Sequence, residues 1–115
     1  MVIERGDVVW ADFGSPGGSE PAKVRPCVVL QADWLMASKI QTVLTVPLTS
    51  NTAMERFPGN VLVPSGASGL DKDSVANVTQ VGPVSREFVD PHPVGMLPAY
   101  LLGQVEAGVR LALSL

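Results

Sequence analysis

Residues 24–31 read Val-Arg-Pro-Cys-Val-Val-Leu-Gln, and this stretch decides which kind of fold the chain can form. The four residues after Pro26 are all apolar, which is typical of a short strand buried on both of its faces. Pro26 lies near the start of the stretch, where the loss of a backbone N–H is tolerated. The sequence therefore predicts a buried β-strand over residues 24–31.

The segments on either side carry the same signature of short strands separated by turns. Residues 7–13 alternate and are rich in β-branched and aromatic side chains, and a cluster of Gly, Ser and Pro follows them directly. Residues 33–38 leave room for no more than a turn or two of helix. Further strands are expected at 40–48, 60–63 and 74–80, and 81–85 could add a short one.

From Pro98 onward the pattern changes to that of a helix, with Pro98 suited to the first turn. One apolar stripe recurs at steps of three to four residues: Leu101, Leu102, Val105, Val109, Ala112 and Leu113. We expect this stripe to pack on the core, although its last residues could join a contact between two copies. The whole pattern predicts a mainly β protein with α: a small, bent antiparallel sheet or partly open barrel closed by a C-terminal helix.

Length and composition favour one folded domain over residues 1–115. Apolar residues make up 46% of the 115 residues and charged residues 17%, a balance that supports a hydrophobic core and excludes disorder for the bulk of the chain. Cys27 and His92 are the only residues of their types, so we expect no structural zinc and no cofactor. With no disulfide, no signal peptide and no membrane-spanning stretch in the sequence, a cytoplasmic protein is expected.

The charge balance does not favour general attraction to polyanions. Eight Lys and Arg against eleven Asp and Glu give a net charge of -3. A nucleic-acid partner would therefore need a local basic patch. Its candidate members are Lys23, Arg25, Arg56, Lys72 and Arg86.

Most of the familiar catalytic motifs are absent from the sequence. There is no Gly-x-Ser-x-Gly, no Gly-x-x-x-x-Gly-Lys, no pair of His and no cluster of carboxylates with metal spacing. What remains is polar side chains at strand ends and in the loop before residue 24, which can bind an extended ligand or position a phosphate. They are Ser19, Glu20, Arg25, Thr49, Ser50, Asn77, Thr79 and Gln80.

Four blocks, in this order and spacing, resemble the MazF/PemK (Kid) family of toxin endoribonucleases. They are Arg-Gly-Asp-Val-Val-Trp-Ala-Asp at 5–12, Gly-Ser-Glu-Pro at 18–21, the stretch at 24–31, and Val-Pro-Leu-Thr-Ser-Asn at 46–51. The likeness continues through 59–61, 73–78 and the closing helix. It implies an SH3-like β-barrel (CcdB/PemK-like) that forms a homodimer, cuts single-stranded mRNA at short sequences without a metal, and is held inactive by a MazE-like antitoxin.

The resemblance also implies roles for individual residues. Arg25 and Thr49 match the family's catalytic Arg and Thr, although by residue type alone they could be an Arg flanking a buried strand and a Thr satisfying a turn. The Kid branch carries a catalytic His where this chain has Ser19, and Arg and Asp where it has Asn77 and Thr79, so this chain follows the MazF branch. Serine is a poor general base, so we expect Ser19 to contact phosphate and treat Glu20 as a candidate base. The expected substrate-binding residues are Ser19, Glu20, Lys23, Ser50, Asn77 and Gln80, with Asn77 and Gln80 as readers of base edges.

Two other hypotheses stay open at the level of sequence. One is a non-enzymatic gyrase poison of the CcdB type, although this chain lacks that group's Trp-Gly-Ile ending; the other is a small barrel that only binds protein or nucleic acid. We expect Cys27 to be a small buried hydrophobe and His92 a surface residue. Trp10 is expected in the core or at a dimer interface, and Trp34 on the surface.

Overall fold

The computed structural model describes residues 3–14 and 24–115. The predicted site residues Ser19, Glu20 and Lys23 lie outside these ranges. The strands are β1 (Asp7–Asp12), β2 (Val24–Val29), β3 (Thr42–Thr49), β4 (Val61–Val63), β5 (Ser74–Ala76), β6 (Gly82–Ser85) and β7 (Gly95–Met96). The helices are α1 (Asp33–Met36), α2 (Ser65–Ser68) and α3 (Ala99–Leu113), with 3₁₀ turns η1 (Thr52–Arg56), η2 (Val78–Gln80) and η3 (Arg86–Phe88).

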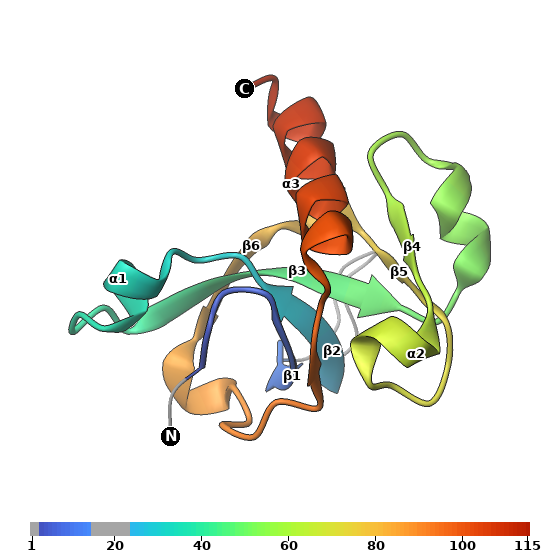
Figure 1. Ribbon diagram of the computed structural model, residues 1–115. Coiled ribbons are helices and arrows are strands. Elements are labelled where there is room, and N and C mark those ends of the chain that lie inside the picture. Colours follow the sequence, from blue (N-terminus) through green and yellow to red (C-terminus); the bar gives the residue numbers. More distant parts are fainter. Residues whose placement is uncertain (1–2, 15–23) are drawn as a thin grey trace.

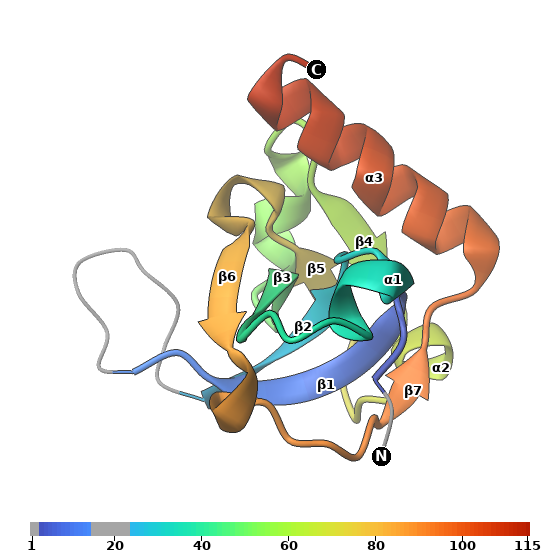
Figure 2. The ribbon, with the colours of Figure 1, turned by 90° about the vertical axis from the view of Figure 1, so that its left-hand side faces the viewer.

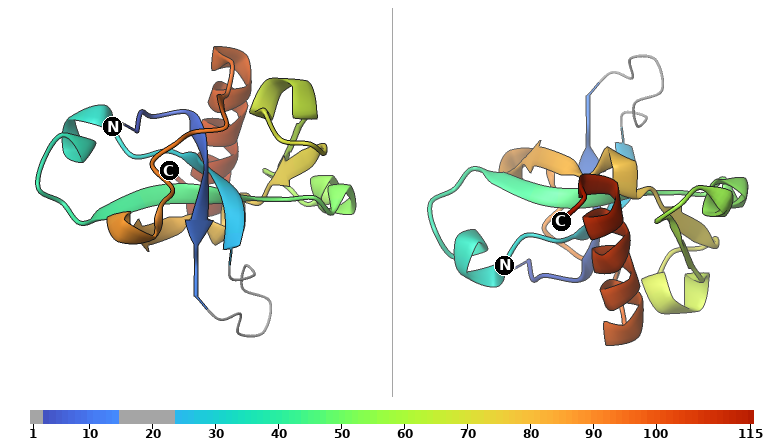
Figure 3. Two further views of the ribbon diagram at one scale, coloured as in Figure 1. Left: turned by 90° about the horizontal axis from the view of Figure 1, so that it is seen from below. Right: turned by 90° about the horizontal axis from the view of Figure 1, so that it is seen from above.

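The strands form one strongly curled antiparallel sheet in the order β4-β5-β3-β2-β1-β7, and β6 also pairs with β3. The long strand β3 organises the sheet, because its first half pairs with β6, its middle with β2 and its last residues with β5. In Figure 3, β1 and β2 run across β3, which shows how steeply the sheet coils. This curled sheet with a C-terminal helix is the predicted fold class.

The two faces of the sheet build two apolar clusters, because residues on a strand point alternately to opposite sides. Val8, Val28 and Val46 lie in the first cluster, which α3 covers with Leu101 and Val105. Val9, Cys27 and Val29 lie in the second. Figures 1 and 2 show α3 crossing one side of the sheet. Strand β2 is therefore apolar on both faces, as residues 24–31 predicted.

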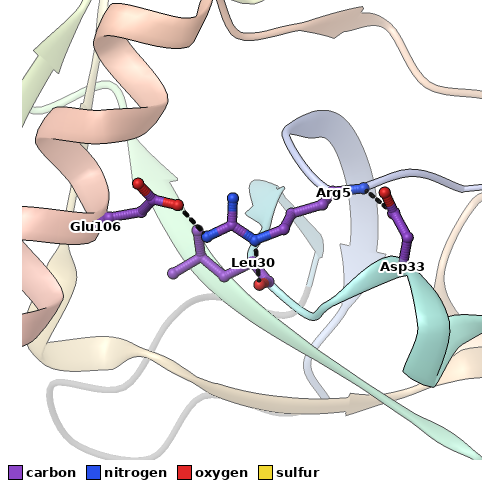
Figure 4. A network of polar contacts seen from close by, with 4 residues as sticks. All are labelled: Arg5, Leu30, Asp33 and Glu106. Atoms are coloured by element: carbon purple, nitrogen blue, oxygen red, sulfur yellow. Dashed lines mark hydrogen bonds and ion pairs between the residues drawn. The ribbon is translucent and has the colours of Figure 1, made fainter.

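Arg5 ties the start of the chain to β2 and α3 (Figure 4). Its Nε donates a hydrogen bond of 3.0 Å to the carbonyl oxygen of Leu30, and its guanidinium forms an ion pair with Glu106. The backbone N–H of Arg5 donates to the Asp33 carboxylate at 2.7 Å. Helix α3 also packs closely against the chain at Gly59. A Cβ on Gly108 would lie 2.1 Å from the Gly59 carbonyl oxygen, so this contact requires glycine at position 108.

The predicted strands are found, with one clear error of extent. Residues 74–80 were expected to form one strand, but β5 ends at Ala76 and the 3₁₀ turn η2 follows. The backbone N–H of Asn77 donates to Pro47 and that of Val78 donates to the side chain of Asn60, so two polar contacts replace the ladder of hydrogen bonds. Helix α2 was not predicted, because no helix was expected between the strands at 60–63 and 74–80.

Helix α3 extends beyond the sheet that its apolar stripe was expected to cover. Leu101 and Val105 are buried, whereas Ala112 is exposed and Leu113 is 52% exposed. The stripe thus packs on the core through its first turns, and the contact between two copies expected for its last residues stays a prediction. Among the described residues, no helix is long and apolar enough to cross a lipid bilayer.

Candidate active site

Strands β2 and β3 separate at one end, and the sequence explains why. Their pairing runs from Val29↔Thr45 to Cys27↔Pro47 and stops there. Pro26 and Pro47 have no backbone N–H to continue the ladder. The carbonyl oxygen of Pro47 accepts a hydrogen bond of 2.9 Å from Asn77, and the last residues of β3 pair with β5 instead. The end of β2 is thus left beside an open space.

A cavity of about 380 Å³ lies at this separation. The two predicted catalytic residues, Arg25 and Thr49, both line it, as does the predicted substrate-binding residue Ser50. Continuing the register of Cys27↔Pro47 by two residues would set Arg25 opposite Thr49. The remaining lining residues are Trp10, Val24, Pro26, Leu48, Leu70, Asp71, Lys72 and Ser74.

Arg25 is half-buried, and its Nε is buried with no hydrogen-bond partner among the described residues. A buried donor left without an acceptor costs about 1–3 kcal/mol, so such groups are rare unless a ligand completes them. A guanidinium presents several N–H donors in a planar fork that fits two oxygens of a phosphate. The geometry at Arg25 therefore suits an anion, and a phosphate in particular.

Thr49 presents a hydroxyl with one bond already made. Its Oγ1 accepts a hydrogen bond of 3.2 Å from the backbone N–H of Asn51. Because a hydroxyl can accept and donate at once, its proton stays available for an oxygen in the cavity. Ser50 follows on the exposed rim and adds a second hydroxyl. One permanent cation and two hydroxyls can bind and polarise a phosphate.

The structure does not bring Asn77 and Gln80 to the lining of this cavity. Both are half-buried around η2, and the Asn77 side chain accepts a hydrogen bond of 3.4 Å from the Thr79 hydroxyl. Their role as readers of base edges stays a prediction. Of the members of the expected basic patch that the structure describes, Arg25 and Lys72 line the cavity. The other two do not: Arg86 donates to the Met36 carbonyl, and Arg56 lies over the Phe57 ring.

Trp10 and Lys72 are two of the lining residues that were not identified as site residues from the sequence. Trp10, expected in the core or at a dimer interface, is 39% exposed at the cavity, so it is not a core residue of the single chain, and the interface stays a prediction. Lys72 was named only as one of several basic residues. No local motif brings 70–74 beside residue 25, because this neighbourhood depends on β3 pairing with both β2 and β5.

Cys27 and His92 offer no alternative chemistry at this place. Cys27 is fully buried, and burial raises the pKa of its thiol to about 12, although a hydrogen bond with Thr45 acts in the opposite direction. It therefore remains a neutral thiol at physiological pH. His92 is exposed beside Asp90, away from the cavity lining. Within the ranges 3–14 and 24–115, no three His, Cys, Asp or Glu side chains gather in a way that could hold a metal ion.

The chain is similar to known toxins over its whole length. Residues 4–113 match the family model of the PemK-like, MazF-like toxins of type II toxin–antitoxin systems. Endoribonuclease MazF6 of Mycobacterium tuberculosis is 44% identical over 115 residues, with all of both chains covered.

Solved structures share the fold at lower identity. MazF from Deinococcus radiodurans superimposes with a TM-score of 0.82 at 20% identity, covering 100% of this chain and 99% of that one. A MazE–MazF structure from the same organism gives a TM-score of 0.78 at 21% identity, covering 100% and 98%. The family model and the 44% identical endoribonuclease favour the endoribonuclease hypothesis over a gyrase poison or a simple binding module. The full-length family match and the 44% identity establish that this chain belongs to the PemK-like, MazF-like toxins of type II toxin–antitoxin systems.

Proposed function

We propose that this protein is a toxin endoribonuclease that cuts single-stranded mRNA at a short sequence without a metal ion. Family membership supports the enzyme class, and the cavity where β2 and β3 separate supports the choice of site. The observation that carries the site is the buried Nε of Arg25, whose proton no described residue accepts, at a cavity that Thr49 also lines. We infer that residues 1–115 act as one toxin domain, and that the cytoplasm, where mRNA is found, is the place of action.

The reaction needs few protein groups because RNA carries its own nucleophile. The 2′-oxygen attacks the adjacent phosphorus, the bond from phosphorus to the 5′-oxygen breaks, and the products are a 2′,3′-cyclic phosphate and a 5′-hydroxyl. The proton of the 2′-hydroxyl goes to a base, and the leaving 5′-oxygen gains a proton. The protein has to hold the phosphate in line with the 2′-oxygen and stabilise the charge that develops.

Arg25 and Thr49 have distinct parts in this scheme. The Arg25 guanidinium grips two phosphate oxygens and neutralises the charge that grows during attack. Thr49 accepts from the Asn51 N–H and donates its own proton to a phosphate oxygen, so its hydroxyl is held in one orientation. We assign the proton from the 2′-hydroxyl to Glu20 as candidate base. The further substrate contacts that we propose are Ser19, Lys23, Ser50, Asn77 and Gln80.

Sequencing the ends of a mixed RNA after incubation with the purified protein tests this function directly. Cuts should fall at one short sequence and leave 2′,3′-cyclic phosphate and 5′-hydroxyl ends. Excess chelator should leave the rate unchanged, because no step uses a metal. Replacing the 2′-hydroxyl at the cut site by hydrogen should abolish cleavage, and a deoxy substrate cut at the normal rate would refute the mechanism.

We propose two protein partners for this chain. The first is a second copy, since one chain offers little surface for several nucleotides, and light scattering should give about 24 kDa, twice the chain mass of 12.1 kDa.

The second is a MazE-like antitoxin, an acidic and largely extended peptide that competes with RNA for Arg25. The MazE–MazF complex of the same fold supports this choice. Full cleavage activity in a purified complex with the protein encoded beside this one would contradict inhibition.

A further inference from the structure

Trp10 is an unusual residue for its place in the sheet. It lies inside β1, where Asp7, Val8, Val9 and Ala11 are all buried, and yet 39% of its surface is exposed. A large indole is costly to leave in water, and an exposed aromatic side chain at a cavity is the usual form of a stacking surface. In the strand register Trp10 stands opposite Pro26, which also lines the cavity.

The wall around Trp10 is apolar. Val24 is 54% exposed and lines the same cavity, together with Pro26, Leu48 and Leu70. A flat aromatic ring can pack on these nonpolar side chains, whereas a phosphate makes no favourable contact with them. The apolar wall and the cation Arg25 thus share one cavity, which matches a nucleotide, with its flat base and its anionic phosphates.

Lys72 supplies a second cation at the cavity, from a segment that is well held. Gly69 ends α2 with φ of 83°, and a Cβ there would lie 2.2 Å from the Val94 carbonyl oxygen. The Asp73 carboxylate accepts the Ser65 N–H at 2.9 Å, and the Ser74 hydroxyl donates to the Lys72 carbonyl at 3.4 Å. Asp73 is thus engaged with α2, and the charged residues that line the cavity within the described ranges are Arg25, Lys72 and Asp71, one positive charge in net.

We propose that this cavity is a subsite for the nucleotide next to the cleaved bond, in which Trp10 stacks on the base and Lys72 binds the phosphate that follows the scissile one. The inference rests on the proposed ribonuclease function and adds to it a base platform and a second phosphate contact. Arg25 engages the reacting phosphate, whereas Lys72 and Trp10 are positioning residues that fix which bond is presented to it.

Stacking is tested by fluorescence, because the two tryptophans can be separated. Trp34 lies on α1, is 74% exposed and does not line the cavity. In a Trp34→Phe protein the only indole is Trp10, and in a Trp10→Phe protein it is Trp34. Short single-stranded DNA of mixed sequence is the probe, since it offers bases and phosphates without the attacking hydroxyl. It should quench Trp10 emission and leave Trp34 emission unchanged. Equal quenching of both, or of neither, would overturn the stacking assignment.

The contribution of stacking to DNA affinity is tested with Trp10→Ala and with the conservative substitution Trp10→Phe. Loss of one stacked base should weaken binding of the same DNA by at least about 5-fold for Trp10→Ala. Trp10→Phe should keep most of the affinity, because a smaller ring still stacks. If dilution of the protein changes Trp10 emission and DNA does not, Trp10 belongs to a contact between two copies and the proposal fails.

Lys72→Ala tests the second phosphate contact, and Lys39→Ala is its matched control. Both lysines are exposed, but Lys39 precedes the opposite end of β3. Lys72→Ala should reduce the slope of log affinity against log salt by about 0.7, the value for one contact with a single strand. Lys72→Arg should restore that slope, and Lys39→Ala should leave it unchanged. An unchanged slope in Lys72→Ala would refute the contact.

Cleavage assays separate this inference from the function on which it rests. Lys72→Ala and Trp10→Ala should raise KM and shift the distribution of cut sites, while the single-turnover rate at saturating RNA stays close to that of the unaltered protein. If the unaltered protein cuts no RNA, the proposed function fails. If it cuts RNA and neither substitution alters KM or the cut sites, the function stands and the subsite is wrong.

Discussion

Arg5 and Arg25 are the same residue type, but the two regions around them differ in whether they supply acceptors for the guanidinium donors. Arg5 donates from its Nε to Leu30, forms an ion pair with Glu106, and is fixed through its backbone by Asp33. The Nε of Arg25 is buried, and no described residue accepts its proton. The described residues thus accept the Nε proton of Arg5 and leave that of Arg25 without an acceptor.

The contrast shows how a structural cation differs from one kept for a ligand. A satisfied arginine contributes to folding through its hydrogen bonds, whereas a buried donor without an acceptor opposes folding until a ligand supplies one. Stability and activity should therefore respond in opposite ways to substitutions at the two sites.

The largest effect is expected from Arg25→Ala. If the guanidinium stabilises charge that appears only as the 2′-oxygen attacks, single-turnover cleavage at saturating RNA should fall by at least ~100-fold, about 2.7 kcal/mol, as for a lost oxyanion donor. Arg25→Lys should rescue only part of the rate, because an ammonium keeps the charge and loses the planar fork. Urea unfolding of Arg25→Ala should give an unfolding free energy equal to or above that of the unaltered protein.

Arg110→Ala is the control for the loss of one positive charge, since Arg110 is exposed on α3 and does not line the cavity. It should cut RNA at a near-normal rate. A folded Arg25→Ala protein that also cuts at a near-normal rate would contradict the catalytic assignment and leave Arg25 as a residue that only flanks a strand.

Thr49→Ala should have the next largest effect on cleavage. It removes one neutral hydrogen bond to the phosphate, so the single-turnover rate should fall about 3- to 10-fold. Thr49→Ser keeps the hydroxyl and should retain most of the rate. Because the Thr49 hydroxyl also accepts from Asn51, unfolding is measured beside cleavage. A rate loss in Thr49→Ser as large as in Thr49→Ala would show that the methyl group, and not the hydroxyl, matters.

Arg5→Ala should lower stability and leave cleavage near normal, the opposite of what is expected for Arg25→Ala. It removes the hydrogen bond to Leu30 and the ion pair with Glu106, both only partly shielded from water, so the free energy of unfolding should fall by about 1–2 kcal/mol. Cleavage at a temperature where the variant is fully folded should be near normal. A large loss of cleavage with unchanged stability would make the comparison between the two arginines untenable.

Much of the fold was accessible from local patterns in the sequence. The apolar run at 27–30 and the helical stripe from Leu101 to Val109 report directly which residues meet the core, because burial sets the period. The alternation at 7–13 predicted a strand correctly, although β1 is buried on both of its faces. The resemblance to MazF/PemK proteins added the family and the enzyme class, and the comparisons confirm both.

The errors lie where distant contacts decide the structure. Residues 78–80 have the composition of a strand, yet they turn because Asn60 accepts the Val78 N–H. Leu113 fits the helical stripe and is 52% exposed, so the stripe alone does not say where the contact with the sheet ends.

The candidate site divides in the same way. Arg25 and Thr49 could be named because they stand in recognisable blocks, and the structure brings both to one cavity. Trp10 also stands in such a block, and Lys72 was named in the basic patch, but neither was assigned to the site. They reach that cavity only through the pairing of β1 with β2 and of β5 with β3. Asn77 and Gln80 were chosen for their chemistry, and chemistry alone does not say which side of η2 a side chain occupies.

The smallest effect is expected from the ion pair of Arg5 with Glu106, isolated from the other contacts of Arg5. Each side chain is 32% exposed, so the charges keep part of their hydration and salt screens their attraction. A double-mutant cycle of Arg5→Ala and Glu106→Ala should give a coupling of about 0.2–1 kcal/mol at low salt, the range for exposed pairs. At ~1 M salt, where the Debye length is about 3 Å, that coupling should largely vanish. The rest of the loss in Arg5→Ala should persist, because the bond to the Leu30 carbonyl is not an ion pair and the Arg5 backbone bond to Asp33 is present in every variant. A coupling that is large and insensitive to salt would mean that the pair, and not the bond to Leu30, is what completes Arg5 and fastens α3 to the sheet.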